Sequence, residues 1–144
     1  MALLTGFLLV AGLGFFHHFG ILGVQLLVSR RPHETHRAIL KAFFGLLILH
    51  TAEIVAFAGV YWLLLDAGWF GTLGGTFSEN FGDLIYFSGI NFVTLGYTQL
   101  TTEGSIRMIS MMQSLGGFMV LTWSATFIYS VWQEAVKLRR DQQP

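Results

Sequence analysis

Four titratable residues lie inside stretches of the chain that are otherwise apolar, where ionisable side chains are costly and are by default candidates for function. These residues are His17, His18, His50 and Glu53. His50 and Glu53 are three positions apart and would share one face of a helix. Imidazole and carboxylate groups are ligands that suit zinc and similar ions. The sequence therefore predicts a divalent-metal or proton-sensing site, or alternatively a hydrogen-bonded contact between two apolar segments.

The same four residues are expected at one depth in a membrane. His17 and His18 precede Arg30 by 13 and 12 residues, and Glu53 follows Lys41 by 12 residues. At 1.5 Å of helical rise per residue, these separations place the cluster about 18 Å from the nearest basic residues. A common depth favours contact between the first apolar segment and the second.

A second candidate site is the stretch Thr94-Leu95-Gly96-Tyr97-Thr98, which interrupts an apolar run. It suits neither a helix nor a strand and is expected to be extended backbone. Such backbone is tolerated at membrane depth only where it is buried in protein or lines a water-filled path. Gly96 permits a positive φ, which lets the chain turn its carbonyl groups. We therefore expect this stretch to line or coordinate something polar.

The composition is that of a membrane protein. Of 144 residues, 53% are hydrophobic and 11% are charged, against about 25% charged in soluble domains. The net charge is zero, so nothing suggests nucleic-acid binding, and the absence of cysteine excludes disulfides and thiolate metal sites. No nucleophile–base pair is evident on an accessible loop, and we do not expect an enzyme.

Three segments are long and apolar enough to span a bilayer, which takes about 20 residues. They cover Ala2–Val28, Ala38–Leu65 and Gly104–Leu138. Between the second and third, Gly68–Asn80 is rich in glycine and threonine and is expected to be a loop. The helix expected over Phe81–Val93 is too short to span. We therefore predict an all-α membrane protein with three transmembrane helices and a re-entrant helix and loop between spans two and three.

The basic residues predict the orientation. Of eight Lys and Arg residues, four lie in 30–41 and three in 137–140. The positive-inside rule puts both clusters in the cytoplasm. We expect a multi-pass protein of the plasma (inner) membrane with its N-terminus outside and its C-terminus cytoplasmic. Four acids would then surround the outer side of the re-entrant stretch: Asp66, Glu79, Asp83 and Glu103.

The stretch from Tyr86 to Gln99 reads YFSGINFVTLGYTQ. It resembles the pore signature of the potassium channel superfamily, of which many prokaryotic members read like YFSFVTLTTVGYGD. The matching positions are Tyr86, Phe87, Ser88, Thr94, Gly96 and Tyr97. The resemblance implies a pore module of outer helix, pore helix, filter and inner helix over residues 32–140. Residues 1–31 would be an additional N-terminal transmembrane helix.

In that family, filter loops from four chains replace the hydration shell of the ion with rings of backbone carbonyls. The resemblance thus implies a homotetramer in the lipid bilayer that passively conducts monovalent cations, potassium above all, through Thr94 to Thr98. Leu95 and Tyr97 are expected to pack against pore-helix aromatics such as Tyr86 and Phe87. Thr98 stands in place of the family's second filter glycine, which leaves strict potassium selectivity open.

Further alternatives stay open. Gly116-Gly117 lies about where the family has its inner-helix hinge glycine, and the pair is either a gating hinge or a site of close helix packing. The whole chain could instead be a small membrane metal-binding protein or enzyme that uses the His/Glu cluster. A third possibility is an accessory protein with the pore fold and a collapsed filter.

Overall fold

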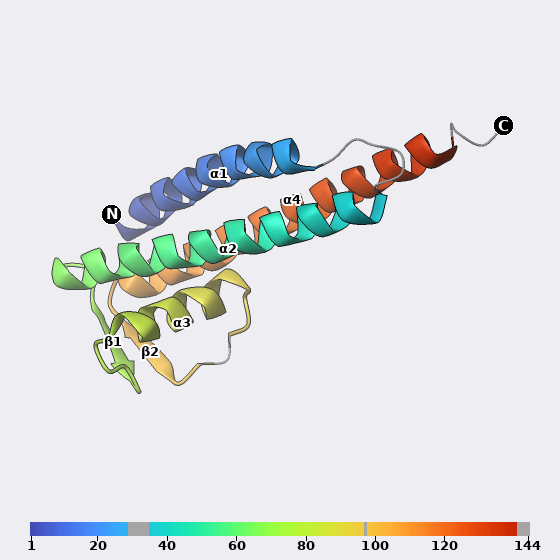
Figure 1. The fold of residues 1–144 in the computed structure, drawn as a ribbon. Coiled ribbons are helices and arrows are strands. Elements are labelled where there is room, and N and C mark those ends of the chain that lie inside the picture. The colour runs from blue at the N-terminus through green and yellow to red at the C-terminus, as the bar shows by residue number, and fades with distance from the viewer. Residues whose placement is uncertain (29–34, 97, 141–144) are drawn as a thin grey trace.

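Three long helices form the body of the protein in the computed structural model, which describes residues 1–28, 35–96 and 98–140 (Figure 1). They are α1 (Ala2–Leu27), α2 (Thr35–Asp66) and α4 (Ile106–Arg140). All three contain stretches long and apolar enough to cross a membrane, which confirms the three predicted spans. The N-terminus and the end of α2 lie at one end of the bundle, and the start of α2 and the end of α4 lie at the other (Figure 1).

Small residues let these helices approach closely. A Cβ atom added at Gly45 of α2 would lie 2.7 Å from Val24 Cγ1 of α1, and one added at Gly116 of α4 would lie 2.8 Å from Val10 Cγ1 of α1. Within a bilayer, helix association depends on such van der Waals packing because lipid is as apolar as the side chains. The glycines therefore help to hold α1 against both α2 and α4.

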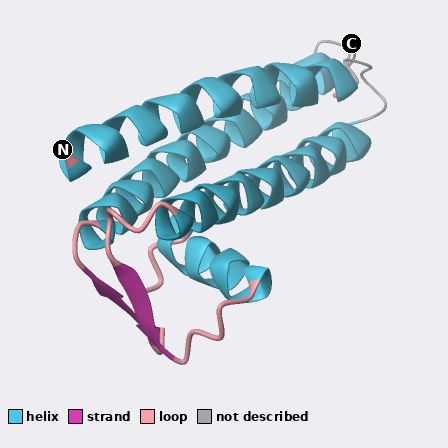
Figure 2. Cartoon of the chain, turned by 90° about the vertical axis from the view of Figure 1, so that its left-hand side faces the viewer, coloured by secondary structure: helices cyan, strands magenta, loops and turns pink. Residues whose placement is uncertain are grey.

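A short two-stranded antiparallel sheet lies at the end of the bundle where α2 ends and α4 begins (Figure 2). Strand β1 (Thr72–Gly75) pairs with β2 (Leu100–Glu103), with Thr72 opposite Glu103 and Gly75 opposite Leu100. Gly75 has a φ of 74°, and a Cβ atom there would collide with the carbonyl of Gln99. The prediction that all of Gly68–Asn80 is loop is thus wrong for β1, because its partner strand lies far along the chain.

Helix α3 (Phe81–Phe92) has 12 residues, which makes it about 18 Å long and too short to cross a bilayer core of about 30 Å. The side chain of Asn80 caps it by accepting a hydrogen bond from the backbone N–H of Asp83 at 2.8 Å. The helix starts near the two-stranded sheet and points toward the middle of the bundle (Figure 1). The predicted short helix between spans two and three is confirmed.

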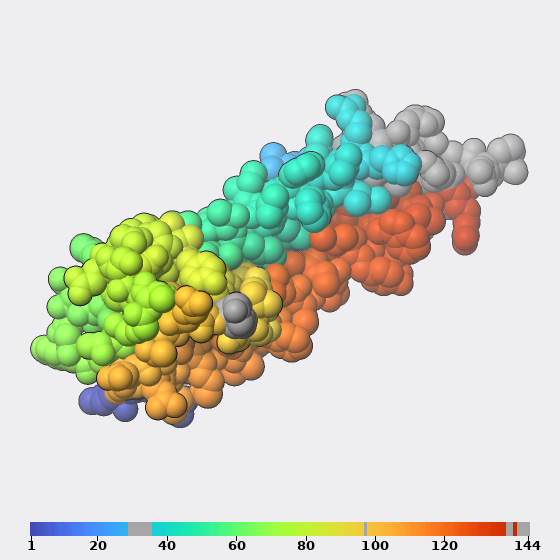
Figure 3. All heavy atoms as spheres, turned by 90° about the horizontal axis from the view of Figure 1, so that it is seen from below, coloured from blue at the N-terminus to red at the C-terminus, as the bar shows by residue number. Residues whose placement is uncertain are grey.

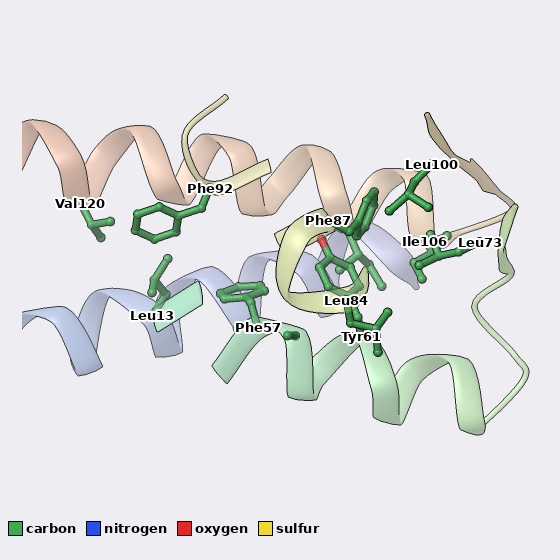
Figure 4. Packing of buried hydrophobic residues seen from close by; sticks show 12 residues of the cluster. Leu13, Phe57, Tyr61, Leu73, Leu84, Phe87, Phe92, Leu100, Ile106 and Val120 are labelled. Atoms are coloured by element: carbon green, nitrogen blue, oxygen red, sulfur yellow. The ribbon is translucent and has the colours of Figure 1, made fainter. Parts of the chain in front are cut away.

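The main core lies where α3 meets α2 and α4 (Figure 4). Phe87 of α3 packs edge-on against Tyr61 of α2, with ring centroids 5.0 Å apart. Phe92, the last residue of α3, is fully buried. Leu73 of β1 and Leu100 of β2 belong to the same cluster. This core therefore fixes both ends of the stretch that follows α3.

Candidate functional site

In the backbone directly after α3, two residues with a positive φ stand on either side of one without. Thr94 has a φ of 56° and Gly96 a φ of 68°, while Leu95 between them does not have a positive φ. The positive φ expected at Gly96 is confirmed. Thr94 is a surprise, because a β-branched residue rarely adopts this conformation. The reason is the end of α3: the backbone N–H of Thr94 donates to the carbonyl of Asn91 at 3.1 Å, and that of Leu95 donates to the carbonyl of Ile90 at 3.0 Å. These two bonds form a Schellman motif, which ends a helix with a left-handed residue.

Thr98 behaves differently from a filter glycine. Its φ is not positive, as expected of a β-branched residue. Its hydroxyl accepts a hydrogen bond from the backbone N–H of Leu100 at 3.0 Å. Thr98 thus serves the turn that leads into β2, while Tyr97 lies outside the described residues.

Within one chain, the residues that directly follow α3, 93–96, are on the surface (Figure 3). Thr94 and Gly96 are exposed, and the Leu95 side chain is 65% exposed. Tyr86 on α3 is also exposed, whereas Phe87 is buried against Tyr61. The expectation that Phe87 packs behind this stretch is therefore wrong, because consecutive helical residues point about 100° apart and Phe87 faces the core.

A chain of hydrogen bonds holds α3 between α2 and α4. The Tyr61 hydroxyl donates to Gln113 Oε1 at 2.7 Å. Gln113 Nε2 donates to the Ser88 hydroxyl oxygen at 2.8 Å, and that hydroxyl donates to the carbonyl of Ile54 at 2.8 Å. Sequence reasoning missed Tyr61 and Gln113. The available signal was that polar side chains inside apolar spans need buried partners.

This network predicts a measurable coupling between Tyr61 and Gln113. Gln113→Leu leaves the buried Tyr61 hydroxyl without its acceptor and should lower the free energy of unfolding by about 1–3 kcal/mol. Tyr61→Phe leaves Gln113 Oε1 unpaired in the same way. The double variant removes both partners and should lose less than the sum of the two single losses. Unfolding of the purified protein in detergent measures all three, and strictly additive losses would contradict the network.

Gly116 and Gly117 lie within α4, which is helical on both sides of them. A Cβ atom on Gly117 would collide with the carbonyl oxygen of Phe92 and lie 2.8 Å from its carbonyl carbon. Gly116 faces Val10 of α1 instead. These contacts support the close-packing alternative, and the gating hinge stays a prediction.

Three of the four predicted titratable residues come together. His17 Nδ1 lies 2.8 Å from Glu53 Oε1, and His50 Nδ1 lies 2.8 Å from Glu53 Oε2. Since an ionised carboxylate only accepts hydrogen bonds, each imidazole donates through Nδ1. His17 and Glu53 are fully buried, and His50 is 16% exposed. His18 is exposed and lies outside this group.

The group joins three helices. Glu53 and His50 belong to α2, and His17 belongs to α1. Ser124 of α4 lies 3.3 Å from His17 Nε2. The hydrogen-bonded contact between the first and second spans is therefore present. The same three side chains could also hold a metal ion, since one ligand atom from each lies within 4.8 Å of the others.

Residues 44–134, more than half of the chain, match a protein family described as "Ion channel". No curated protein and no solved structure matched this chain. The matched range contains most of α2, all of α3, the stretch after it and most of α4. The family is one of channels and not of enzymes. The chain therefore belongs to the ion channel family, with a pore module of the potassium-channel type and an additional candidate membrane helix, α1, before it.

Proposed function

We propose that four copies of this chain surround one path and passively conduct potassium ions, which are held by the backbone carbonyls of residues 94–98. The observation that carries this proposal is a helix too short to span, followed by a non-helical stretch between two spans, inside the range that matches the ion channel family. In a channel of the potassium type, carbonyl rings replace the water around the ion.

Exposed apolar side chains beside the proposed filter support an assembly of four chains. A single loop cannot encircle an ion, and potassium filters combine the loops of four subunits. In the single chain, Leu95, Val93 and Tyr86 expose 65%, 47% and 54% of their surfaces beside the proposed filter. Neighbouring copies would cover these apolar side chains, which supports a homotetramer.

The charges support the proposed orientation. Among the described basic residues, Arg37 and Lys41 lie at the start of α2, and Lys137 and Arg140 lie near the end of α4. By the positive-inside rule the end of the bundle that carries these residues is cytoplasmic. The N-terminus and the two-stranded sheet then lie outside the plasma (inner) membrane. α3 then points its C-terminal, partly negative end toward the middle of the membrane, where it favours a cation.

Selectivity for potassium over sodium is assigned to the inner part of the stretch. Thr98 forms a turn with Leu100 and departs from the family's second glycine. Among the filter residues 94–98, the inner carbonyls, from Thr94 to Tyr97, would therefore discriminate between the two ions. Within this scheme residues 32–140 form the pore module, and residues 1–31 add a span that is not needed to line the path.

The mass of the assembly tests the proposal without depending on conduction. Purified protein in detergent or nanodiscs should give, by light scattering or native mass spectrometry, four copies of the 16.1 kDa chain. A monomer or a dimer under conditions that preserve membrane assemblies would contradict a pore with four filter loops.

A further inference from the structure

Two imidazoles and one carboxylate converge inside the bundle from two different helices. The ligand atoms of His17, His50 and Glu53 lie within 4.8 Å of one another. The rings of His17 and His50 are nearly parallel, with centroids 5.5 Å apart. Two histidines and a glutamate are a known zinc ligand set, which leaves a fourth position for water or another ligand. The arrangement thus resembles a three-ligand metal site.

The contact between Ser124 and His17 also supports a metal site. A metal-binding histidine usually donates the N–H of its other ring nitrogen to a nearby acceptor, which orients the ring. If His17 binds an ion through Nδ1, its proton resides on Nε2. The Ser124 hydroxyl oxygen lies 3.3 Å from that nitrogen and can accept the hydrogen bond. Ser124 therefore provides the outer partner that a metal-bound His17 needs.

We propose that His17, His50 and Glu53 bind a divalent transition-metal ion of the zinc class and that the ion fastens α1 to α2. Two nitrogen ligands select against magnesium and calcium, which prefer oxygen. The ion would replace the two N–H···O contacts to Glu53 with direct bonds to the same three side chains.

The position of this site gives it a consequence for the pore, which rests on the proposed channel function. The His50 ring lies 5.6 Å from the ring of Phe92 at the end of α3, and the backbone of Phe92 is where Gly117 of α4 makes its close approach. A bound ion would therefore stiffen the base of the pore helix. The site itself can be tested without any flux measurement.

Metal binding is tested on the untagged full-length protein after treatment with a chelator. Zinc content after dialysis and the visible absorption of added Co²⁺ report the site directly. We expect about one zinc per chain in the wild type, as for a three-ligand site. Zinc, but not magnesium, should raise the unfolding temperature, since a ligand that binds only the folded state stabilises it.

The neighbouring histidine provides a matched control. His17→Gln and His50→Gln should weaken zinc binding by at least about tenfold, while Ser124→Ala, which removes only the outer partner, should weaken it by about tenfold. His18→Gln should bind as the wild type does. The proposal is overturned if the wild type holds no zinc, or if His18→Gln and His50→Gln bind alike. Protein that conducts potassium but holds no zinc would refute the metal site alone, and protein that holds zinc but does not conduct would refute the channel alone.

Discussion

Gly96→Ala should abolish potassium flux while the protein still folds and assembles. Gly96 has a φ of 68° and no heavy atom within 4 Å of the position that a Cβ would take. Within one chain the added methyl group therefore meets open space, and its cost there is conformational, about 1–2 kcal/mol for a left-handed alanine. The backbone is expected to escape this strain by turning to a negative φ, which swings a carbonyl away from the path in all four subunits.

Efflux of potassium from liposomes measures this effect, with the assembled mass of each variant as a check on folding. Gly89→Ala is the matched control, because Gly89 lies in α3 and its added Cβ would meet only Ile54 Cγ2 at an ordinary 3.7 Å. We expect wild-type flux from Gly89→Ala and none from Gly96→Ala. Equal flux from the two variants would show that Gly96 does not shape the conducting backbone.

Gly117→Ala should destabilise the pore module itself. Its Cβ would collide with the Phe92 carbonyl oxygen and lie 2.9 Å from Phe92 Cα. These are backbone atoms at the end of α3, so relief requires the pore helix to move away from α4. Overpacking of this kind typically costs about 1–3 kcal/mol, and it acts directly before the proposed filter. We expect a lower unfolding temperature together with a large loss of flux.

Two other glycines sharpen this experiment. Gly59→Ala in α2 places its Cβ in open space and should be neutral. Gly116→Ala meets the Val10 side chain rather than backbone, and it should cost less than Gly117→Ala. A gating hinge makes a different prediction, in which Gly116→Ala and Gly117→Ala both fold normally and change only channel opening. Normal stability of Gly117→Ala would therefore favour the hinge.

The features that local sequence patterns encode were predicted well. Length and apolarity were enough for the three spans and for the short helix between the second and third. Gly96 is a residue that tolerates a positive φ, and it has one.

The features that were missed depend on rotation and on distant partners. An apolar helix gives little indication of which face is buried. His17 and His18 were therefore both predicted to join the cluster, because they lie at the same depth, although only His17 reaches Glu53. For the same reason the burial of Phe87 was not foreseen. The pairing of β1 with β2 joins segments on either side of α3, and no local pattern specifies such a partner.

Thr94 shows a further limit. A rule based on side-chain sterics argues against a positive φ at a β-branched residue, yet Thr94 has one. The residue directly after a helix often takes this left-handed conformation, in a Schellman motif, and Thr94 holds that position after α3. The backbone N–H of Leu95 donates to the carbonyl of Ile90 at 3.0 Å, which ties the strained residue to the last turn of α3.

The most direct test of the proposed function is the flux of potassium compared with sodium through the purified wild-type protein in liposomes. Vesicles loaded with one cation and diluted into a medium without it report the permeability of each ion separately. We predict that the potassium gradient dissipates much faster than the sodium gradient. Equal rates for the two ions would contradict potassium selectivity, and no flux of either ion would contradict the channel itself.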